Sequence, residues 1–147
     1  ELKIDDNLPM LTTDEDKLRQ ILVNLLGNAA KFTEDGTILL RAWQSTEDSC
    51  INISVADTGM GIPQEQIPGL FQGVAQLEDQ TAPRKFPGTG LGLAISARLV
   101  DALGGTISVS SRVSRGSTFT VSIPLEVSKQ KRVVAAHPAT TSPANKT

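Results

Sequence analysis

The stretch CINISVADTGMGI, residues 50–62, runs from a strand-like pattern into a glycine-rich loop. Its first eight residues are rich in β-forming side chains, and the similar run TILLRAW at 37–43 precedes it across a short polar connection, which predicts an antiparallel strand pair. The second strand ends at Asp57, and the glycines of the loop permit positive φ or a close approach of a ligand to the backbone. An Asp in this place can accept hydrogen bonds from an amino group, although an Asp-Thr-Gly turn that only ends a strand is common.

Two helical patterns and a second strand pair surround this stretch. Apolar residues at helical spacing predict one helix over about 14–33 and another over 91–103, the latter ended by a Gly pair. TISVSS (106–111) and STFTVSIPL (117–125) are alternating strands. The order of elements predicts a two-layer α/β sandwich, with a mixed, mainly antiparallel sheet and about three helices on one face, rather than a doubly wound parallel sheet.

The remaining segments are less regular. LKI at 2–4 suggests a short strand, and PQEQIPGLF at 63–71 has room for a short helix. Residues 72–88 show neither helical nor strand periodicity, and such a long loop in a compact domain is usually functional or disordered. Because residues from 126 are rich in Pro, Thr, Ala and Lys, we expect one domain over 1–125 and a flexible tail or linker over 126–147.

Length and composition set limits on function. A chain of 147 residues is long enough for one sizeable core, and no apolar run approaches the roughly 18 residues that would span a bilayer. A net charge of −2 provides no basic field for nucleic acid. Cys50 is the only cysteine, so no intrachain disulfide can form. We therefore expect a cytoplasmic domain that itself contacts neither nucleic acid nor membrane, although it could be the cytoplasmic part of a membrane-anchored protein.

The first predicted helix carries a polar stripe beside its apolar one. Asn24, Asn28 and Lys31 follow one another at i, i+4 and i+7, and with Gly27 they lower the helix propensity of the segment by roughly 2 kcal/mol relative to alanines. The stripe could be a polar flank on a surface helix. It could instead hold a hydrated cation and a phosphate chain, because Mg²⁺ prefers oxygen ligands and usually keeps waters and substrate phosphates.

A second glycine cluster, GTGLGL at 88–93, opens the second predicted helix. Its third glycine comes one residue too early for the dinucleotide-binding fingerprint, and it lacks the closing Gly-Lys-Ser/Thr of a P-loop. A glycine-rich helix start nevertheless favours an anion. Arg84 and Lys85 could add charge to the same anion, or could be solvated loop cations.

The motifs are more specific as an ordered set than singly: NLLGNAAKFT (24–33), DTGMGI (57–62), LF (70–71), GTGLGL (88–93) and GGTISVSS…GSTFTVSIPL (104–125). Over about residues 8–125 they resemble the ATP-binding catalytic domain of sensor histidine kinases, in the superfamily that also contains gyrase, the Hsp90 chaperones and MutL. The resemblance implies a Bergerat-type fold that binds ATP and Mg²⁺, with a long ATP lid over about 72–90.

The resemblance also implies individual roles. Asn28 would ligate Mg²⁺, Asn24 and Lys31 would contact the phosphates, and Asp57 would receive the adenine amino group. Thr118 would join the polar network around Asp57. With Arg84, the residues Asn24 and Lys31 form the expected catalytic set. The other expected nucleotide contacts are Gly59, Gly61, Ile62, Phe71 as hinge of the lid, Lys85, Gly88, Thr89, Gly90, Leu91, Gly92 and Leu93.

The expected activity is transfer of the γ-phosphate of ATP to a histidine. ATP-hydrolysing relatives typically have a Glu where this chain has Asn24, and an amide has no basic oxygen to activate water. The acceptor is expected on a two-helix dimerisation domain of the same kinase, through which it would form a homodimer, and a response regulator receiver domain is the expected downstream partner. The alternatives are a gated ATPase of the same superfamily and a non-catalytic module. Val74 and Pro87 motivate the latter, because they depart from the usual lid pattern and Pro fixes φ.

Overall fold

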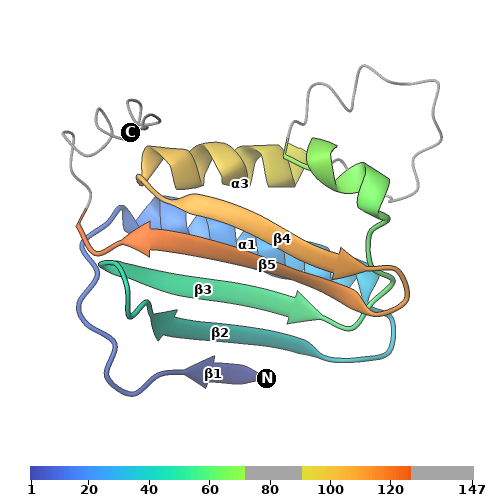
Figure 1. Cartoon of the computed structure of the whole chain (residues 1–147), viewed down its shortest axis with the longest axis horizontal. Coiled ribbons are helices and arrows are strands. Elements are labelled where there is room, and N and C mark those ends of the chain that lie inside the picture. The colour runs from blue at the N-terminus through green and yellow to red at the C-terminus, as the bar shows by residue number, and fades with distance from the viewer. Residues whose placement is uncertain (72–90, 127–147) are drawn as a thin grey trace, which may run out of the picture.

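The computed structural model describes residues 1–71 and 91–126, which form a five-stranded sheet, two α-helices and one 3-10 helix (Figure 1). In chain order the elements are β1 (Leu2–Ile4), α1 (Glu15–Phe32), β2 (Ile38–Gln44), β3 (Cys50–Asp57), η1 (Gln64–Gly69), α3 (Leu91–Ala102), β4 (Thr106–Arg112) and β5 (Gly116–Pro124). The strand order is β1-β2-β3-β5-β4, in which β1 and β2 are parallel and the other neighbours are antiparallel. The predicted α/β sandwich with a mixed, mainly antiparallel sheet is confirmed.

The N-terminus of α1 is capped one residue later than its sequence suggests. Thr13 with Asp16 three residues later resembles a helix-start box, but the N-cap is Asp14, whose carboxylate accepts a hydrogen bond from the Lys17 N–H at 3.2 Å. The Thr13 hydroxyl is buried and has no hydrogen-bond partner among the described residues. Asp and Thr are both favoured at an N-cap. The N-cap is the residue before the helix whose backbone is not helical, and in this structure that residue is Asp14.

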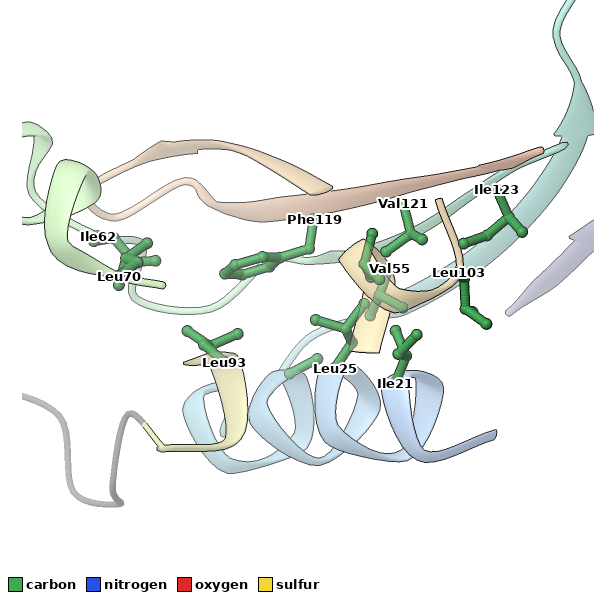
Figure 2. Packing of buried hydrophobic residues seen from close by; sticks show 12 residues of the cluster. Ile21, Leu25, Val55, Ile62, Leu70, Leu93, Leu103, Phe119, Val121 and Ile123 are labelled. Carbon is green, nitrogen blue, oxygen red and sulfur yellow. The ribbon is translucent and has the colours of Figure 1, made fainter. Parts of the chain in front are cut away.

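The core lies between one face of the sheet and the two α-helices. Along β3 and β5 the inward residues pair directly: Ile53 lies opposite Val121 and Val55 lies opposite Phe119. Val55, Phe119 and Val121 pack against the buried stripe of α1, which includes Ile21 and Leu25 (Figure 2), whereas Ile53 belongs to a second cluster that other residues of α1 cover. The outward residues of the same strands are mostly Ser, Thr and Asn, so only one face of the sheet is covered by helices.

A glycine pair ends α3 and turns the chain into β4. The Gly104 N–H donates to the Asp101 carbonyl at 2.9 Å, and the Gly105 N–H donates to the Val100 carbonyl at 3.0 Å. This pair of hydrogen bonds is a Schellman cap, which confirms the prediction that the Gly pair ends the helix. It fixes the direction in which β4 enters the sheet beside β5.

Two sequence predictions lie outside the described residues. One is the irregular loop predicted over 72–88, and the other is the tail predicted over 126–147, of which only Glu126 is described. Neither α1 nor any other described helix has the length and apolar character that a membrane-spanning segment needs.

Candidate functional site

The predicted polar stripe lies on α1, on the side that faces the start of α3. Asn24 and Asn28 are half-buried and Lys31 is exposed. The Asn24 side-chain nitrogen lies 3.3 Å from the Gly92 carbonyl oxygen, in the first turn of α3. The polar stripe on α1 therefore contacts the second glycine cluster, to which Gly92 belongs.

Asp57 ends β3, and its loop rests on the C-terminal end of α1. The Asp57 carboxylate accepts a hydrogen bond from the Gly59 N–H at 2.9 Å, which closes a tight turn. A Cβ at position 59 would lie only 2.2 Å from the Phe32 carbonyl oxygen, so the two segments approach as closely as only glycine allows. The Met60 N–H donates to the same carbonyl at 3.3 Å. Asp57 is thereby held at the end of α1 that carries Lys31.

The far side of this loop is held by the turn between β4 and β5. Gly61 has a φ of 75°, and a Cβ there would lie 1.9 Å from the Arg112 carbonyl oxygen. The Ser114 N–H donates to the Met60 carbonyl at 2.7 Å. The glycines of DTGMGI therefore allow the loop to fit between α1 and the β4–β5 turn.

A buried serine joins the loop, β4 and β5. The Ser111 hydroxyl accepts a hydrogen bond from the Ile62 N–H at 2.8 Å and donates to the Gly116 carbonyl at 2.9 Å. It also lies 2.8 Å from the Ser117 hydroxyl. The Gln64 side chain donates to the Ser111 carbonyl at 2.8 Å, which attaches η1 to the same point.

The β5 residue beside Asp57 is Ser117, not Thr118. The register pairs Asp57 with Ser117, and Ser117 is buried. Thr118 pairs with Ala56, and because strand side chains alternate it belongs to the opposite face of the sheet. The prediction that Thr118 joins the Asp57 network is therefore wrong. Alternation back from the inward Phe119 would have identified Ser117 from the sequence.

Three predicted contacts have side chains in or against the core. Ile62 and Leu93 are buried in the main apolar cluster, so only their backbone is available to a ligand (Figure 2). Phe71 is half-buried and meets Phe119 edge to face, with ring centroids 6.2 Å apart at 85°. Phe71 thus anchors the chain just where the described residues stop.

The rest of the second glycine cluster is only partly described. Leu91 begins α3, and its side chain is not described. The predicted contacts Arg84, Lys85, Gly88, Thr89 and Gly90 lie outside the described residues.

The described residues hold no group of three or more His, Cys, Asp or Glu side chains that could bind a metal by themselves. A cation here would have to be bound by an amide oxygen together with ligand phosphates and water, which is the usual arrangement for Mg²⁺. Asn28 fits this role, because its side chain has no hydrogen bond to another described residue and it lies one helical turn from Asn24.

A family model described as "Histidine kinase-, DNA gyrase B-, and HSP90-like ATPase" matches residues 13–127. The chain belongs to this family. The matched range contains both α-helices and four of the five strands, so this ATPase domain includes all of the site described above.

The curated relatives of this ATPase domain are histidine kinases. The sensor histidine kinase AruS of Pseudomonas aeruginosa is 51% identical over 114 residues, which are 76% of this chain and 11% of AruS. The circadian input-output histidine kinase CikA of Synechococcus elongatus is 46% identical over 125 residues, 84% of this chain and 16% of CikA. The aerobic respiration control sensor protein ArcB of Escherichia coli is 40% identical over 123 residues, 82% of this chain and 16% of ArcB. The chain thus spans only 11–16% of the length of these relatives.

Solved structures agree with the family. Full-length ShkA in complex with AMPPNP superposes with a TM-score of 0.72 at 36% identity, covering 86% of this chain and 25% of ShkA. The nucleotide-free catalytic domain of the histidine kinase ThkA gives a TM-score of 0.68 at 29% identity, covering 89% of this chain and 80% of that one. The chain therefore has the fold of a histidine kinase catalytic domain.

Proposed function

We propose that this domain binds Mg-ATP and transfers the γ-phosphate to a histidine on a dimerisation domain. The observation that supports this best is the meeting of three motifs. The Asp57 loop rests on the C-terminal end of α1 through Phe32, and α1 contacts the glycine-rich start of α3 through Asn24. A carboxylate, an amide-rich helix face and a helix N-terminus then border one region.

Asp57 is suited to bind an exocyclic amino group. One carboxylate oxygen takes the Gly59 N–H, while the other has no hydrogen bond to a described residue. An ionised carboxylate only accepts hydrogen bonds, so it favours adenine, which has an amino group at C6, over guanine, which has a carbonyl oxygen there. Asp57 would therefore provide specificity for adenine.

The phosphates would lie between α1 and the start of α3. The N–H groups at the start of α3 are not used within the helix and carry partial positive charge, which favours a phosphate. Lys31 is exposed and forms no ion pair with a described residue, so its ammonium is free for the same charge. Asn28 would hold Mg²⁺, which neutralises the phosphate charge when bound. Arg84 and the glycines at 88 and 90 remain predicted phosphate contacts.

Transfer to an acceptor fits this site better than hydrolysis. The described residues place no carboxylate or imidazole on the stripe of Asn24, Asn28 and Lys31 that could activate water as a general base. Positioning and charge neutralisation supply most of the catalysis in phosphoryl transfer. The acceptor histidine and a response regulator receiver domain are the partners that we propose, in a cytoplasmic two-component pathway.

Labelled phosphate transfer tests the proposal. The 147-residue domain is mixed with γ-labelled ATP, Mg²⁺ and the two-helix dimerisation domain of its own kinase, and label on the acceptor histidine is measured. We expect transfer by the parent domain, little by Asn28→Ala, and parental transfer by the control Asn7→Ala, which changes an exposed Asn away from α1. Mg-ATP binding without labelling would contradict the kinase proposal. Steady phosphate release without any acceptor would indicate a gated ATPase instead.

A further inference from the structure

The orientation of the Asn24 amide is fixed by its neighbours. Its Nδ2 lies 3.3 Å from the Gly92 carbonyl oxygen and 3.2 Å from the Ser96 hydroxyl. A carbonyl oxygen can only accept a hydrogen bond, so the atom that faces Gly92 must be the amide nitrogen. In this orientation Asn24 Oδ1 accepts a hydrogen bond from the Gln20 Nε2 at 2.9 Å.

In this orientation Asn24 can accept a further hydrogen bond but cannot donate one. The amide nitrogen has two N–H groups and two acceptors on α3, Gly92 and Ser96, so both N–H groups are used. Oδ1 accepts one hydrogen bond from Gln20 and keeps a second lone pair. Asn24 therefore presents an acceptor oxygen, and could donate to a phosphate only after breaking its contact with α3.

Ser96 is an unusual residue for its position. It is fully buried, and it shares the inward stripe of α3 with Leu93 and Val100 at spacings of three and four residues. A hydroxyl buried among apolar side chains is costly unless it forms a hydrogen bond. The hydrogen bond that this hydroxyl forms is with Asn24 on α1.

We propose that Ser96 is a positioning residue: its hydroxyl holds the Asn24 amide so that Oδ1, and not Nδ2, is the atom left open to a ligand. The effect of Ser96 on nucleotide binding rests on the proposed function, whereas its hydrogen bond to Asn24 is present in the domain without nucleotide. The bond also ties the middle of α1 to the second turn of α3, one turn after Gly92 of the glycine cluster. Ser96 thus couples the geometry of Asn24 to the start of α3.

Nuclear magnetic resonance of the nucleotide-free domain tests the bond directly. In Ser96→Ala we expect the side-chain amide resonances of Asn24 to shift and its amide protons to exchange faster with water. The control is Ser54→Ala, which removes a hydroxyl from another buried serine, on β3, that has no hydrogen bond to another described residue. Asn24 resonances that are the same in Ser96→Ala and the parent would overturn the proposal. If Ser96→Ala does not fold, Ser96→Cys replaces it, since sulfur fills the site but is a weak acceptor.

A double-mutant cycle on nucleotide binding tests the consequence. Because both bonds of Nδ2 are long, Ser96→Ala should weaken Mg-ATP binding about 3- to 10-fold in calorimetry. In an Asn24→Ala background, Ser96→Ala should cause no further loss, since the amide that it positions is gone. The same loss in both backgrounds would show that Ser96 acts through the fold and would overturn the proposal. A parent domain that binds no Mg-ATP would refute the proposed function instead, and the resonance experiment would still decide the role of Ser96.

Discussion

Removal of the Ser111 hydroxyl is expected to destabilise the domain more than any other single Ser→Ala change among the described residues. The hydroxyl lies where the DTGMGI loop meets β4 and β5. It accepts from the Ile62 N–H at 2.8 Å, donates to the Gly116 carbonyl at 2.9 Å and contacts the Ser117 hydroxyl at 2.8 Å. Ser111 and Ser117 are each 6% exposed, so water cannot readily replace these bonds.

The size of the loss in stability follows from the buried groups that lose a hydrogen-bond partner when the Ser111 hydroxyl is removed. A buried N–H without a partner costs about 1–3 kcal/mol, and here the group is the backbone N–H of Ile62. The Ser117 hydroxyl can rotate, but the position that Ser111 filled offers it no new acceptor. We therefore expect Ser111→Ala to lower the free energy of unfolding by about 2–4 kcal/mol.

Urea unfolding of the 147-residue domain measures this difference. The midpoint should fall while the slope with denaturant stays the same, because the surface exposed on unfolding does not change. Ser54→Ala is the matched control, since Ser54 is 7% exposed and has no side-chain hydrogen bond to another described residue. Its free energy of unfolding should change by less than about 0.5 kcal/mol. Equal midpoints for the two variants would refute the role assigned to Ser111.

Two further predictions concern stability. Gly59→Ala should destabilise the domain by about 1–3 kcal/mol, because its Cβ would meet the Phe32 carbonyl oxygen, whereas Gly27→Ala should stabilise it by about 0.8–1 kcal/mol, since Gly27 has open space around it on an exposed helix face. Urea midpoints that move the same way in both variants would contradict this. The hydrogen bonds from the Lys17 side chain and N–H lower the pKa of Asp14, so its stabilising effect is present above the ordinary pKa and is lost as pH falls through the lowered one. Asp14→Ala should therefore lower the melting temperature at pH 7 but much less near about pH 2, and an equal loss at both pH values would count against the cap.

The helices and strands could be predicted because each carries its own periodicity. Their ends are less certain, as α1 shows, where Thr13 and Asp14 are both good caps by residue type and Asp14 takes the position. The central pairing of β3 with β5 is not written in local sequence, because turns specify neighbours only within each strand pair. It follows from burial of both apolar faces against the same two helices.

The site residues also divide into those that local sequence identifies and those whose role depends on how the helices and strands pack. Asn28 and Asp57 could be selected by residue type and spacing, since each lies on one element with a clear pattern. Ser117 could have been found by alternation along β5, although Thr118 beside it has similar chemistry. Ser96 gave one signal, a polar residue in an apolar stripe, but its partner depends on how α3 packs against α1, which no local pattern describes.

Base specificity tests the central claim most directly, because it depends on Asp57 and not on the fold alone. Calorimetry should compare Mg-ATP with Mg-GTP for the parent domain and for Asp57→Ala. Because a hydrogen bond to a charged acceptor contributes about 1.5–3 kcal/mol, the parent should bind ATP at least about tenfold more tightly than GTP. Asp57→Ala should lose that preference while it remains folded. Equal affinity of the parent for both nucleotides, or an undiminished preference in Asp57→Ala, would contradict the assignment of this loop as an adenine site.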